Sequence, residues 1–187
     1  MRLVFIGPPG VGKGTQCRRV ARHLGVPHIS TGDMLRGMRG DAELGTSVRQ
    51  LIDQGRLVPD AMAMDLLANR LRASDAAGGW VLDGFPRTVP QAEMLDAFLR
   101  ERAEHLMAAV VLGAPREVLL DRLVRRQQSE SRDDDDLATI ERRLQVYRVQ
   151  TQPVIDYYGA GGRVKRFDAT SDEDSVYAEL LRCIEES

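Results

Sequence analysis

The sequence predicts an α/β fold in which helices cover both faces of a parallel β-sheet. Short, continuously apolar runs are typical of strands that are buried on both faces. Such runs occupy residues 3–6, 80–82, 107–112 and 164–167, and residues 27–29 are a weaker candidate. Longer segments with helical periodicity separate the runs. Because strands that alternate with helices form parallel sheets, this order along the chain indicates the fold class.

Apolar stripes identify the helical segments. One stripe consists of Leu44, Val48, Leu51 and Ile52, and another of Leu137, Ile140, Leu144 and Tyr147. Residues 16–24 form a further helical segment after the first apolar run. The interval between residues 29 and 80 is much longer than the roughly one dozen residues that a simple crossover needs. We therefore expect extra helices there, forming a small flap beside the sheet.

Length and composition restrict the class of protein. A chain of 187 residues with 43% hydrophobic residues can build one compact domain. A net charge of −2 argues against a general nucleic-acid or membrane-surface partner. The sequence lacks an apolar run long enough for a membrane span and lacks a secretory signal. Two cysteines, Cys17 and Cys183, are too few for a disulfide framework or a four-cysteine zinc site. We therefore expect a cytoplasmic protein without zinc.

The basic residues are strongly biased, since 24 are arginine and only Lys13 and Lys165 are lysine. A genome rich in G and C produces this bias without any functional cause. A subset of the arginines could nevertheless gather around one anion, because the planar guanidinium group binds phosphate oxygens in pairs.

Residues 7–15, Gly-Pro-Pro-Gly-Val-Gly-Lys-Gly-Thr, carry the strongest motif. They follow the first apolar run and precede a helical segment, which is the context that a phosphate-binding loop requires. Glycines allow backbone N–H groups to surround an anion, and the helix N-terminus adds partial positive charge. Lys13 can then reach the β- and γ-phosphate oxygens. A glycine-rich turn without a ligand is the simpler alternative.

The loop departs from the usual pattern because Gly14 stands where serine or threonine is common, and Thr15 follows. In this variant the chain resembles the nucleoside monophosphate kinases, and adenylate kinases in particular. The resemblance implies an ATP site formed by Gly10, Val11, Gly12, Lys13, Gly14, Thr15, Arg122, Arg126 and Ser171. At the last of these positions the family's short form commonly carries glycine.

A second motif, residues 30–36, follows the weaker strand candidate. Read alone, Ser-Thr-Gly-Asp is a good helix cap. The segment also resembles the acceptor motif of adenylate kinases, in which an arginine equivalent to Arg36 binds the α-phosphate of AMP. Residues 54–60 are similar to the family segment that contacts the adenine. The resemblance implies an AMP site formed by Thr31, Arg36, Arg56, Leu57, Val58, Gly84, Phe85, Arg87, Gln91, Arg132 and Arg143.

A third motif, Asp-Gly-Phe-Pro-Arg at residues 83–87, follows the apolar run 80–82. The carboxyl ends of parallel strands are where α/β sheets bind ligands, so we expect Arg87 to face the same crevice as Lys13. A turn with a solvated arginine is the alternative. The resemblance implies that Asp83 holds Mg²⁺ through water and that Gln91 reads the adenine edge. An amide suits this task because it offers a donor and an acceptor together.

Further arginines lie in the C-terminal half. Arg122 and Arg126 are four residues apart and so share one helix face. Taken singly, they and Arg132 and Arg143 could be solvated surface residues, as we expect for Arg125. Together they match the spacing of adenylate kinases with a short lid, in which the corresponding arginines bind the phosphates of both nucleotides. The resemblance implies catalytic roles for Lys13, Arg87, Arg122, Arg126, Arg132 and Arg143.

The resemblance extends over almost the whole chain. It implies a single P-loop kinase domain of residues 1–187, with a three-layer fold that contains a five-stranded parallel sheet. It also implies two insertions in this domain, a helical AMP-binding flap at 30–58 and a short lid at 126–136. The expected activity is Mg²⁺-dependent transfer of the ATP γ-phosphoryl group to AMP, giving two ADP, by a monomer. A UMP/CMP kinase is an alternative, although Thr31 and Gln91 favour adenine. A P-loop module that binds nucleotide without catalysis would need only the first motif.

Such a transfer is chemically consistent with the residues present. A phosphate acceptor is already anionic and needs no general base, so positioning and fixed positive charge supply nearly all of the catalysis. The three histidines are scattered along the chain, and we interpret them as structural. The acidic run of residues 133–136 could bind a metal, although a solvated loop is the simpler interpretation.

Overall fold

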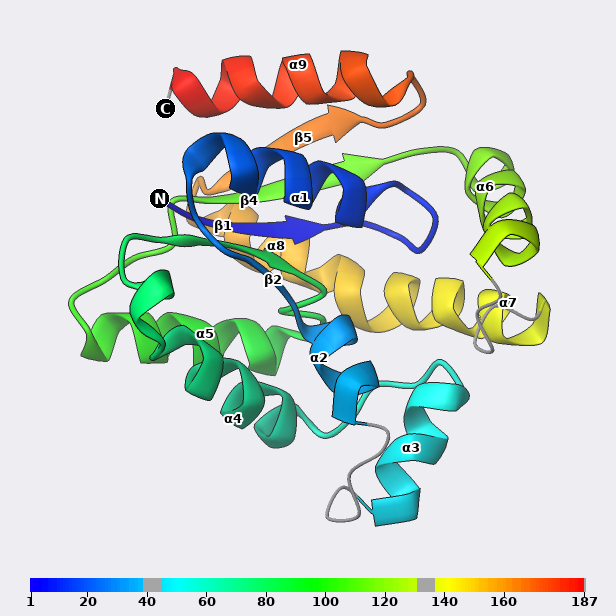
Figure 1. The fold of residues 1–187 in the computed structure, drawn as a ribbon, viewed down its shortest axis with the longest axis horizontal. Coiled ribbons are helices and arrows are strands. Elements are labelled where there is room, and N and C mark those ends of the chain that lie inside the picture. The colour runs from blue at the N-terminus through cyan, green and yellow to red at the C-terminus, as the bar shows by residue number, and fades with distance from the viewer. Residues whose placement is uncertain (39–44, 131–136, 187) are drawn as a thin grey trace.

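The computed structural model describes residues 1–38, 45–130 and 137–186. Within these residues, five parallel strands form one sheet in the order β2-β3-β1-β4-β5 (Figure 1). The strands are β1 (Arg2–Ile6), β2 (His28–Ser30), β3 (Trp80–Asp83), β4 (Ala108–Gly113) and β5 (Val164–Asp168). The predicted five-stranded parallel sheet is therefore confirmed, with β2 and β4 each one residue later than the sequence indicates.

The sheet divides the core into two layers because neighbouring side chains of a strand point to opposite faces. Leu3 and Phe5 of β1 pack into one hydrophobic cluster, and Val4 and Ile6 pack into the other. All four side chains are at most 2% exposed. This burial on both faces is why the strand reads as a continuous apolar run rather than an alternating one.

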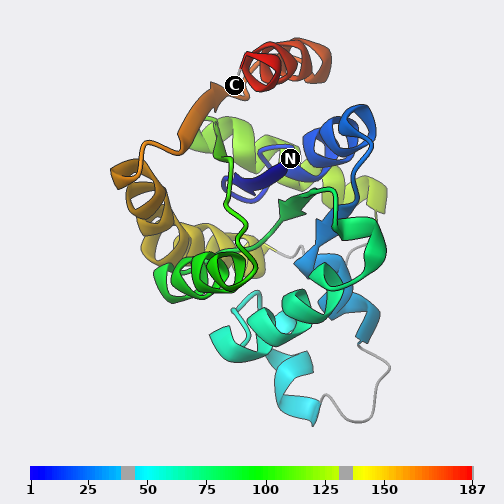
Figure 2. The ribbon, with the colours of Figure 1, turned by 90° about the vertical axis from the view of Figure 1, so that its left-hand side faces the viewer.

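Helices cover both faces, as expected. Helices α1 (Lys13–Leu24) and α9 (Glu173–Glu185) lie on one side of the sheet, and α5 (Val89–Glu101) and α8 (Gln152–Ala160) lie on the other (Figure 2). Helix α1 begins three residues before the predicted segment. The presence of Gly14 in its first turn concealed this start, because glycine is a poor helix former.

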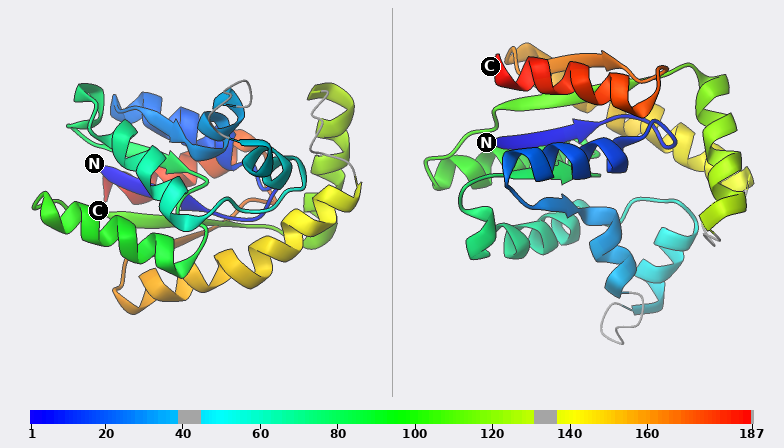
Figure 3. Two further views of the ribbon diagram at one scale, coloured as in Figure 1. Left: turned by 90° about the horizontal axis from the view of Figure 1, so that it is seen from below. Right: turned by 45° about the horizontal axis from the view of Figure 1, so that its top comes forward.

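The long interval between β2 and β3 consists of helices. It contains α2 (Thr31–Gly37), α3 (Gly45–Asp53), α4 (Asp60–Leu71) and a 3₁₀ turn at Ser74–Ala76. Helices α2 and α3 project from the body of the molecule below the carboxyl ends of the strands (Figure 3). The expected extra helices are present, whereas the bounds of the 30–58 insertion stay a prediction.

Helix α6 (Arg116–Glu130) follows β4, and α7 (Leu137–Val146) continues through a π-helical turn at Tyr147–Thr151 into α8 (Figure 1). The π turn ends just before Pro153, which has no N–H group and disturbs the turn that precedes it. Most of the predicted lid, including Arg132, lies outside the described residues. Among the described helices, none has the length and apolarity to cross a membrane.

Candidate active site

The phosphate loop connects β1 to α1 at the carboxyl edge of the sheet. Gly10 and Gly12 have φ angles of +82° and +92°, which L side chains rarely adopt. A Cβ atom on Gly10 would also lie 2.8 Å from the main-chain oxygen of Leu119 and 2.9 Å from Cγ of Leu123. Only glycine therefore permits the loop to pass α6 this closely. The loop leads directly into the N-terminus of α1, where an anion is favoured.

Lys13 is the first residue of α1, and its side chain folds back over the loop. Its Nζ atom donates hydrogen bonds to the main-chain oxygens of Gly7 at 2.7 Å and Pro8 at 3.1 Å. Burial lowers the pKa of Lys13 to about 8, although the negative charge of Asp83 opposes this effect. The ammonium group therefore lies in a poorly hydrated site, where its interaction with an anion is strong.

An open cleft with a volume of about 1510 Å³ extends from this loop. All of the residues that the resemblance implies for the ATP site line it, namely Gly10, Val11, Gly12, Lys13, Gly14, Thr15, Arg122, Arg126 and Ser171. Gln16, Arg18 and Asp172 also line it, and sequence reasoning did not single them out. The side chain of Gln16 is 3% exposed and donates to the main-chain oxygen of Glu173 at 2.9 Å, which joins α1 to α9.

Asp83 ends β3 on the floor of the same cleft. Burial would raise its pKa, but His28, Lys13 and Arg87 together hold the pKa below its ordinary value. Its Oδ2 atom lies 3.6 Å from Nε2 of His28, and would lie 3.4 Å from a Cβ atom on Gly14. A negatively charged carboxylate that faces the phosphate loop is the type of ligand that Mg²⁺ prefers, so the residue fits the predicted metal.

Among the described residues, one cluster has ligand atoms close enough to share a metal ion. It consists of Cys17, His28 and Asp83, whose ligand atoms all lie within 4.8 Å of one another. Both cysteines are free thiols, and burial raises the pKa of the Cys17 thiol well above its ordinary value. His28, which sequence reasoning treated as structural, is therefore a neighbour of the predicted metal ligand.

A second pocket, with a volume of about 650 Å³, opens beside the cleft. The predicted AMP-site residues that line it are Thr31, Arg36, Arg56, Leu57, Val58, Gly84, Phe85, Arg87, Gln91 and Arg143. Arg132 belongs to the same prediction but lies outside the described residues. Leu35, Ile52 and Ala63 add apolar surface that the motifs did not reveal.

The cleft and the second pocket share a wall that contains three arginines, Arg36, Arg87 and Arg143. Burial lowers the pKa of Arg87 to about 10, and the nearby positive charge of Arg143 adds to this effect. The Nε atom of Arg87 donates to the main-chain oxygen of Gly84 at 2.8 Å, which fixes the side chain. Three like charges around one wall favour an anion between them.

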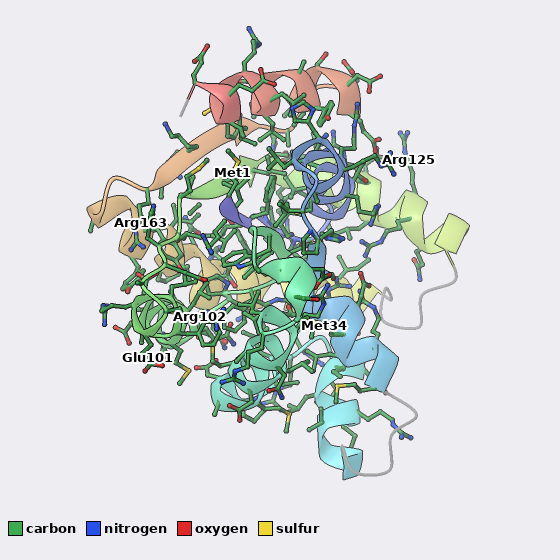
Figure 4. All side chains as sticks on the ribbon, turned by 60° about the vertical axis from the view of Figure 1, so that its left-hand side comes forward. Met1, Met34, Glu101, Arg102, Arg125 and Arg163 are labelled. Atoms are coloured by element: carbon green, nitrogen blue, oxygen red, sulfur yellow. The ribbon has the colours of Figure 1, made fainter. Side chains whose placement is uncertain are left out.

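The other arginines differ in their surroundings. Nη1 of Arg122 donates to the main-chain oxygen of Ala169 at 2.8 Å, so the side chain holds the loop after β5 at the edge of the cleft. Arg126 lines the cleft one helical turn further along α6. Arg125, in contrast, points into solvent from α6 and pairs with Asp121 (Figure 4). Its expected place on the surface is confirmed.

Sequence reasoning also missed Asp60, the first residue of α4. Its Oδ1 atom accepts hydrogen bonds from Nε2 of Gln91 at 2.8 Å and from Oγ1 of Thr88 at 3.0 Å. Asp60 is the last residue of the segment 54–60, which resembles the adenine-contacting segment of the family. This position is the feature of the sequence that could have identified Asp60 as part of the site.

Two pockets that share three guanidinium groups can bring two phosphorylated ligands together. With a phosphate loop at the end of a parallel strand, this arrangement places the chain among the P-loop phosphotransferases. The family model for adenylate kinase matches residues 5–163. The chain belongs to the adenylate kinase family, whose members transfer a phosphoryl group between ATP and AMP.

Individual relatives agree with the family match. The chain is 43% identical to the adenylate kinase of Stenotrophomonas maltophilia over 185 residues, covering 98% of this chain and 99% of that protein. It is 42% identical to that of Cyanothece sp. over 186 residues, covering 99% and 95%. It is 40% identical to that of Thermotoga neapolitana over 211 residues, covering 97% and 96%. The last alignment has more positions than the 187 residues of this chain, and the shorter length of this chain is consistent with the short-lid form.

Proposed function

We propose that this adenylate kinase binds Mg-ATP in the cleft and AMP in the second pocket, and that phosphoryl transfer takes place at the wall between them. The observation that carries the proposal is that Arg36, Arg87 and Arg143 line both spaces. A phosphoryl group that moves from one nucleotide to the other must pass this wall. Because the acceptor phosphate is already anionic, the wall has only to hold the reactants in line and offset their repulsion.

We assign a role to each group by its position. Lys13 contacts the β- and γ-phosphates, because it is the half-buried cation of the phosphate loop. Arg122 and Arg126, from one face of α6, line the cleft and contact the phosphates of ATP. Arg36 anchors the α-phosphate of AMP, and Arg87, Arg143 and Arg132 stabilise the charge on the transferred group.

The role of the metal follows from the donor set. Asp83 would hold Mg²⁺ through water, since its carboxylate lines the cleft next to the phosphate loop. The ion supplies positive charge to the β- and γ-phosphate oxygens when it is bound. We propose no zinc requirement. The chain's own residues orient the nucleotides whether or not their phosphates carry the metal.

The selection of AMP is assigned to Thr31 and Gln91, which line the second pocket and are respectively 4% and 2% exposed. Apolar side chains such as Leu35 and Ile52 provide surface against which a base can pack. A purely nucleotide-binding module would not require this second pocket. We further propose that the protein is a cytoplasmic monomer.

A coupled assay of the purified protein tests the proposal. The acceptors are AMP, CMP, UMP and GMP, each with Mg-ATP, and the expected result is turnover with AMP far above that with the other three. Comparable turnover with CMP or UMP would reassign the second pocket to pyrimidines. Removal of Mg²⁺ by a chelator is expected to abolish turnover and to leave the thermal unfolding midpoint of the protein unchanged.

A further inference from the structure

The Gln91 amide lies in an unusually constrained position. Gln91 is 2% exposed, lies in the first turn of α5 and lines the second pocket. A glutamine amide carries two N–H donors on nitrogen and two acceptor lone pairs on oxygen. Because the oxygen and nitrogen ends are nearly equal in size, the amide can reverse unless its neighbours distinguish them.

Two neighbours make that distinction. The main-chain N–H of Arg87 donates to Oε1 of Gln91 at 2.7 Å, and Nε2 of Gln91 donates to Oδ1 of Asp60 at 2.8 Å. A main-chain N–H can only donate, and a carboxylate oxygen can only accept. A reversed amide would place donor against donor at Arg87 and acceptor against acceptor at Asp60. The observed orientation is therefore the one that satisfies both contacts.

The carboxylate of Asp60 is itself held in place. Oγ1 of Thr88 donates to the same Oδ1 atom at 3.0 Å and accepts from the main-chain N–H of Gln91 at 3.2 Å. Thr88 is the N-cap residue of α5, and Asp60 begins α4. The network therefore ties the starts of two helices together and fixes the distance between the carboxylate and the amide.

These contacts use one N–H group and one lone pair of the Gln91 amide, which leaves one of each for a ligand. The edge of adenine matches this pattern, since N1 accepts and the 6-amino group donates. Hypoxanthine has the opposite pattern, with a donor at N1 and an acceptor at O6. A 6-oxopurine would therefore need the reversed amide, and reversal breaks the contacts with both Arg87 and Asp60.

We propose that Asp60 is a positioning residue that holds the Gln91 amide in the orientation selective for 6-aminopurine over 6-oxopurine nucleoside monophosphates. This inference rests on the proposed function, in which the second pocket binds the acceptor base. Asp60 does not touch the nucleotide and acts only through Gln91. Its contribution is specificity between two ligands of almost equal size, which shape alone distinguishes poorly.

The test is the ratio of kcat/KM for AMP to kcat/KM for IMP, measured with Mg-ATP. IMP differs from AMP only at positions 1 and 6 of the base, so the ratio reports the orientation of the amide. Asp60→Ala removes the acceptor and is expected to lower the ratio about tenfold, or about 1.4 kcal/mol. Asp60→Asn keeps an oxygen at Oδ1 for both donors and is expected to retain a ratio near that of the wild type.

Asp65→Ala is the matched control, because it removes a carboxylate from the exposed side of the same helix. Its ratio is expected to equal that of the wild type. If Asp60→Ala does not fold, Asp60→Ser keeps a polar residue at the start of α4, with its oxygen closer to the main chain, and serves the same comparison. Because the ratio does not depend on the amount of active enzyme, a loss of stability alone does not change it.

The outcomes separate this inference from the proposed function. Wild-type protein that does not phosphorylate AMP overturns the proposed function. Wild-type protein that prefers AMP to IMP, together with an unchanged ratio in Asp60→Ala, overturns the role of Asp60 alone. An unchanged ratio in Gln91→Ala overturns it as well, because the amide would then not distinguish the bases. A fall of the ratio in Asp60→Ala with retention in Asp60→Asn supports it.

Discussion

The Nζ atom of Lys13 lies 2.7 Å from the main-chain oxygen of Gly7, so the ammonium group is hydrogen-bonded to the phosphate loop. A second bond to Pro8 leaves one of its three protons for a ligand. The two carbonyl groups hold the charge at the mouth of the loop before any nucleotide arrives. This preorganisation avoids a cost that a flexible lysine would incur on binding.

Replacement of Lys13 by methionine removes this charge and keeps a side chain of similar length. We expect kcat to fall by roughly a hundredfold to a thousandfold, because a preorganised charge at the reacting phosphates is removed. Lys165→Met is the control, since Lys165 is exposed on β5, away from the cleft. Steady-state kinetics measure turnover, and circular dichroism shows whether the variant is folded. Near-normal turnover in a folded Lys13→Met variant would refute the role of Lys13 at the donor phosphates.

The lowered pKa of Lys13 predicts a specific pH dependence. The pKa is about 8 in the folded protein and 10.5 without burial, so the unfolded chain binds more protons between these values. The free energy of unfolding is therefore expected to gain a contribution that increases with pH in this window. Over the same rise through about pH 8, kcat/KM for ATP should decrease, because the free enzyme loses the ammonium charge.

Denaturant unfolding of the wild type and of Lys13→Met, at about pH 7 and about pH 9.5, measures this contribution as a difference between the two proteins. The difference should shift with pH in favour of the wild type. A difference that does not change with pH would show that Lys13 is hydrated in the folded protein.

Replacement of Arg87 by alanine removes the cation of the shared wall whose pKa is lowered to about 10 by burial. We expect a higher KM for AMP together with a lower kcat, at about 1.5–3 kcal/mol for each charged hydrogen bond to phosphate that the variant cannot form. Arg125→Ala, which removes a solvent-exposed arginine, should leave both parameters unchanged. If Arg87→Ala alters only the KM for ATP, Arg87 has been assigned to the wrong nucleotide.

Thr31→Ala tests the selection of the acceptor base. The Thr31 hydroxyl is 3.5 Å from the main-chain oxygen of Asp83, a weak contact that leaves it available to a ligand. We expect discrimination against CMP and UMP to relax, measured as the ratios of kcat/KM to that for AMP. Unchanged ratios would remove Thr31 from the selection of the base.

Substitution of two glycines of the phosphate loop, Gly10 and Gly12, distinguishes the cost of backbone strain from the cost of a steric clash. Both Gly10 and Gly12 have positive φ angles, but only at Gly10 would a Cβ atom meet other atoms within 4 Å. Gly12→Ala should therefore cost about 1–2 kcal/mol of stability from the left-handed conformation alone. Gly10→Ala should cost more, because α6 must also move. Thermal unfolding compares the two variants, and equal losses of stability would contradict the close approach of Leu119 and Leu123.

Much of the fold was predictable because burial on both faces leaves a direct trace in the sequence. Residues 3–6 and 107–112 are continuously apolar for this physical reason, and the strands lie there. The start of α1 was predicted too late, because Gly14 interrupts the helical pattern. The π turn at Tyr147–Thr151 could not be read from periodicity, since its extra residue breaks the 3.6-residue repeat, although Pro153 marks its place.

The candidate site shows a different limit. The phosphate loop could be recognised from local sequence, because its glycines, lysine and following helix are contiguous. The wall formed by Arg36, Arg87 and Arg143 comes from three distant segments. The position of Arg87 after a parallel strand predicted that it faces the crevice, whereas the family resemblance supplied Arg36 and Arg143. Asp60 was missed because its contact with Gln91 depends on how two helices begin side by side, which hydrophobic periodicity does not record.

The wall between the two pockets also bears on the direction of the reaction. The same three guanidinium groups face both spaces, so they face the same number of phosphates before and after a transfer. ATP with AMP and two molecules of ADP present equal negative charge to this surface. The wall therefore favours neither side of the reaction electrostatically, and the cellular supply of each nucleotide decides which way phosphate flows.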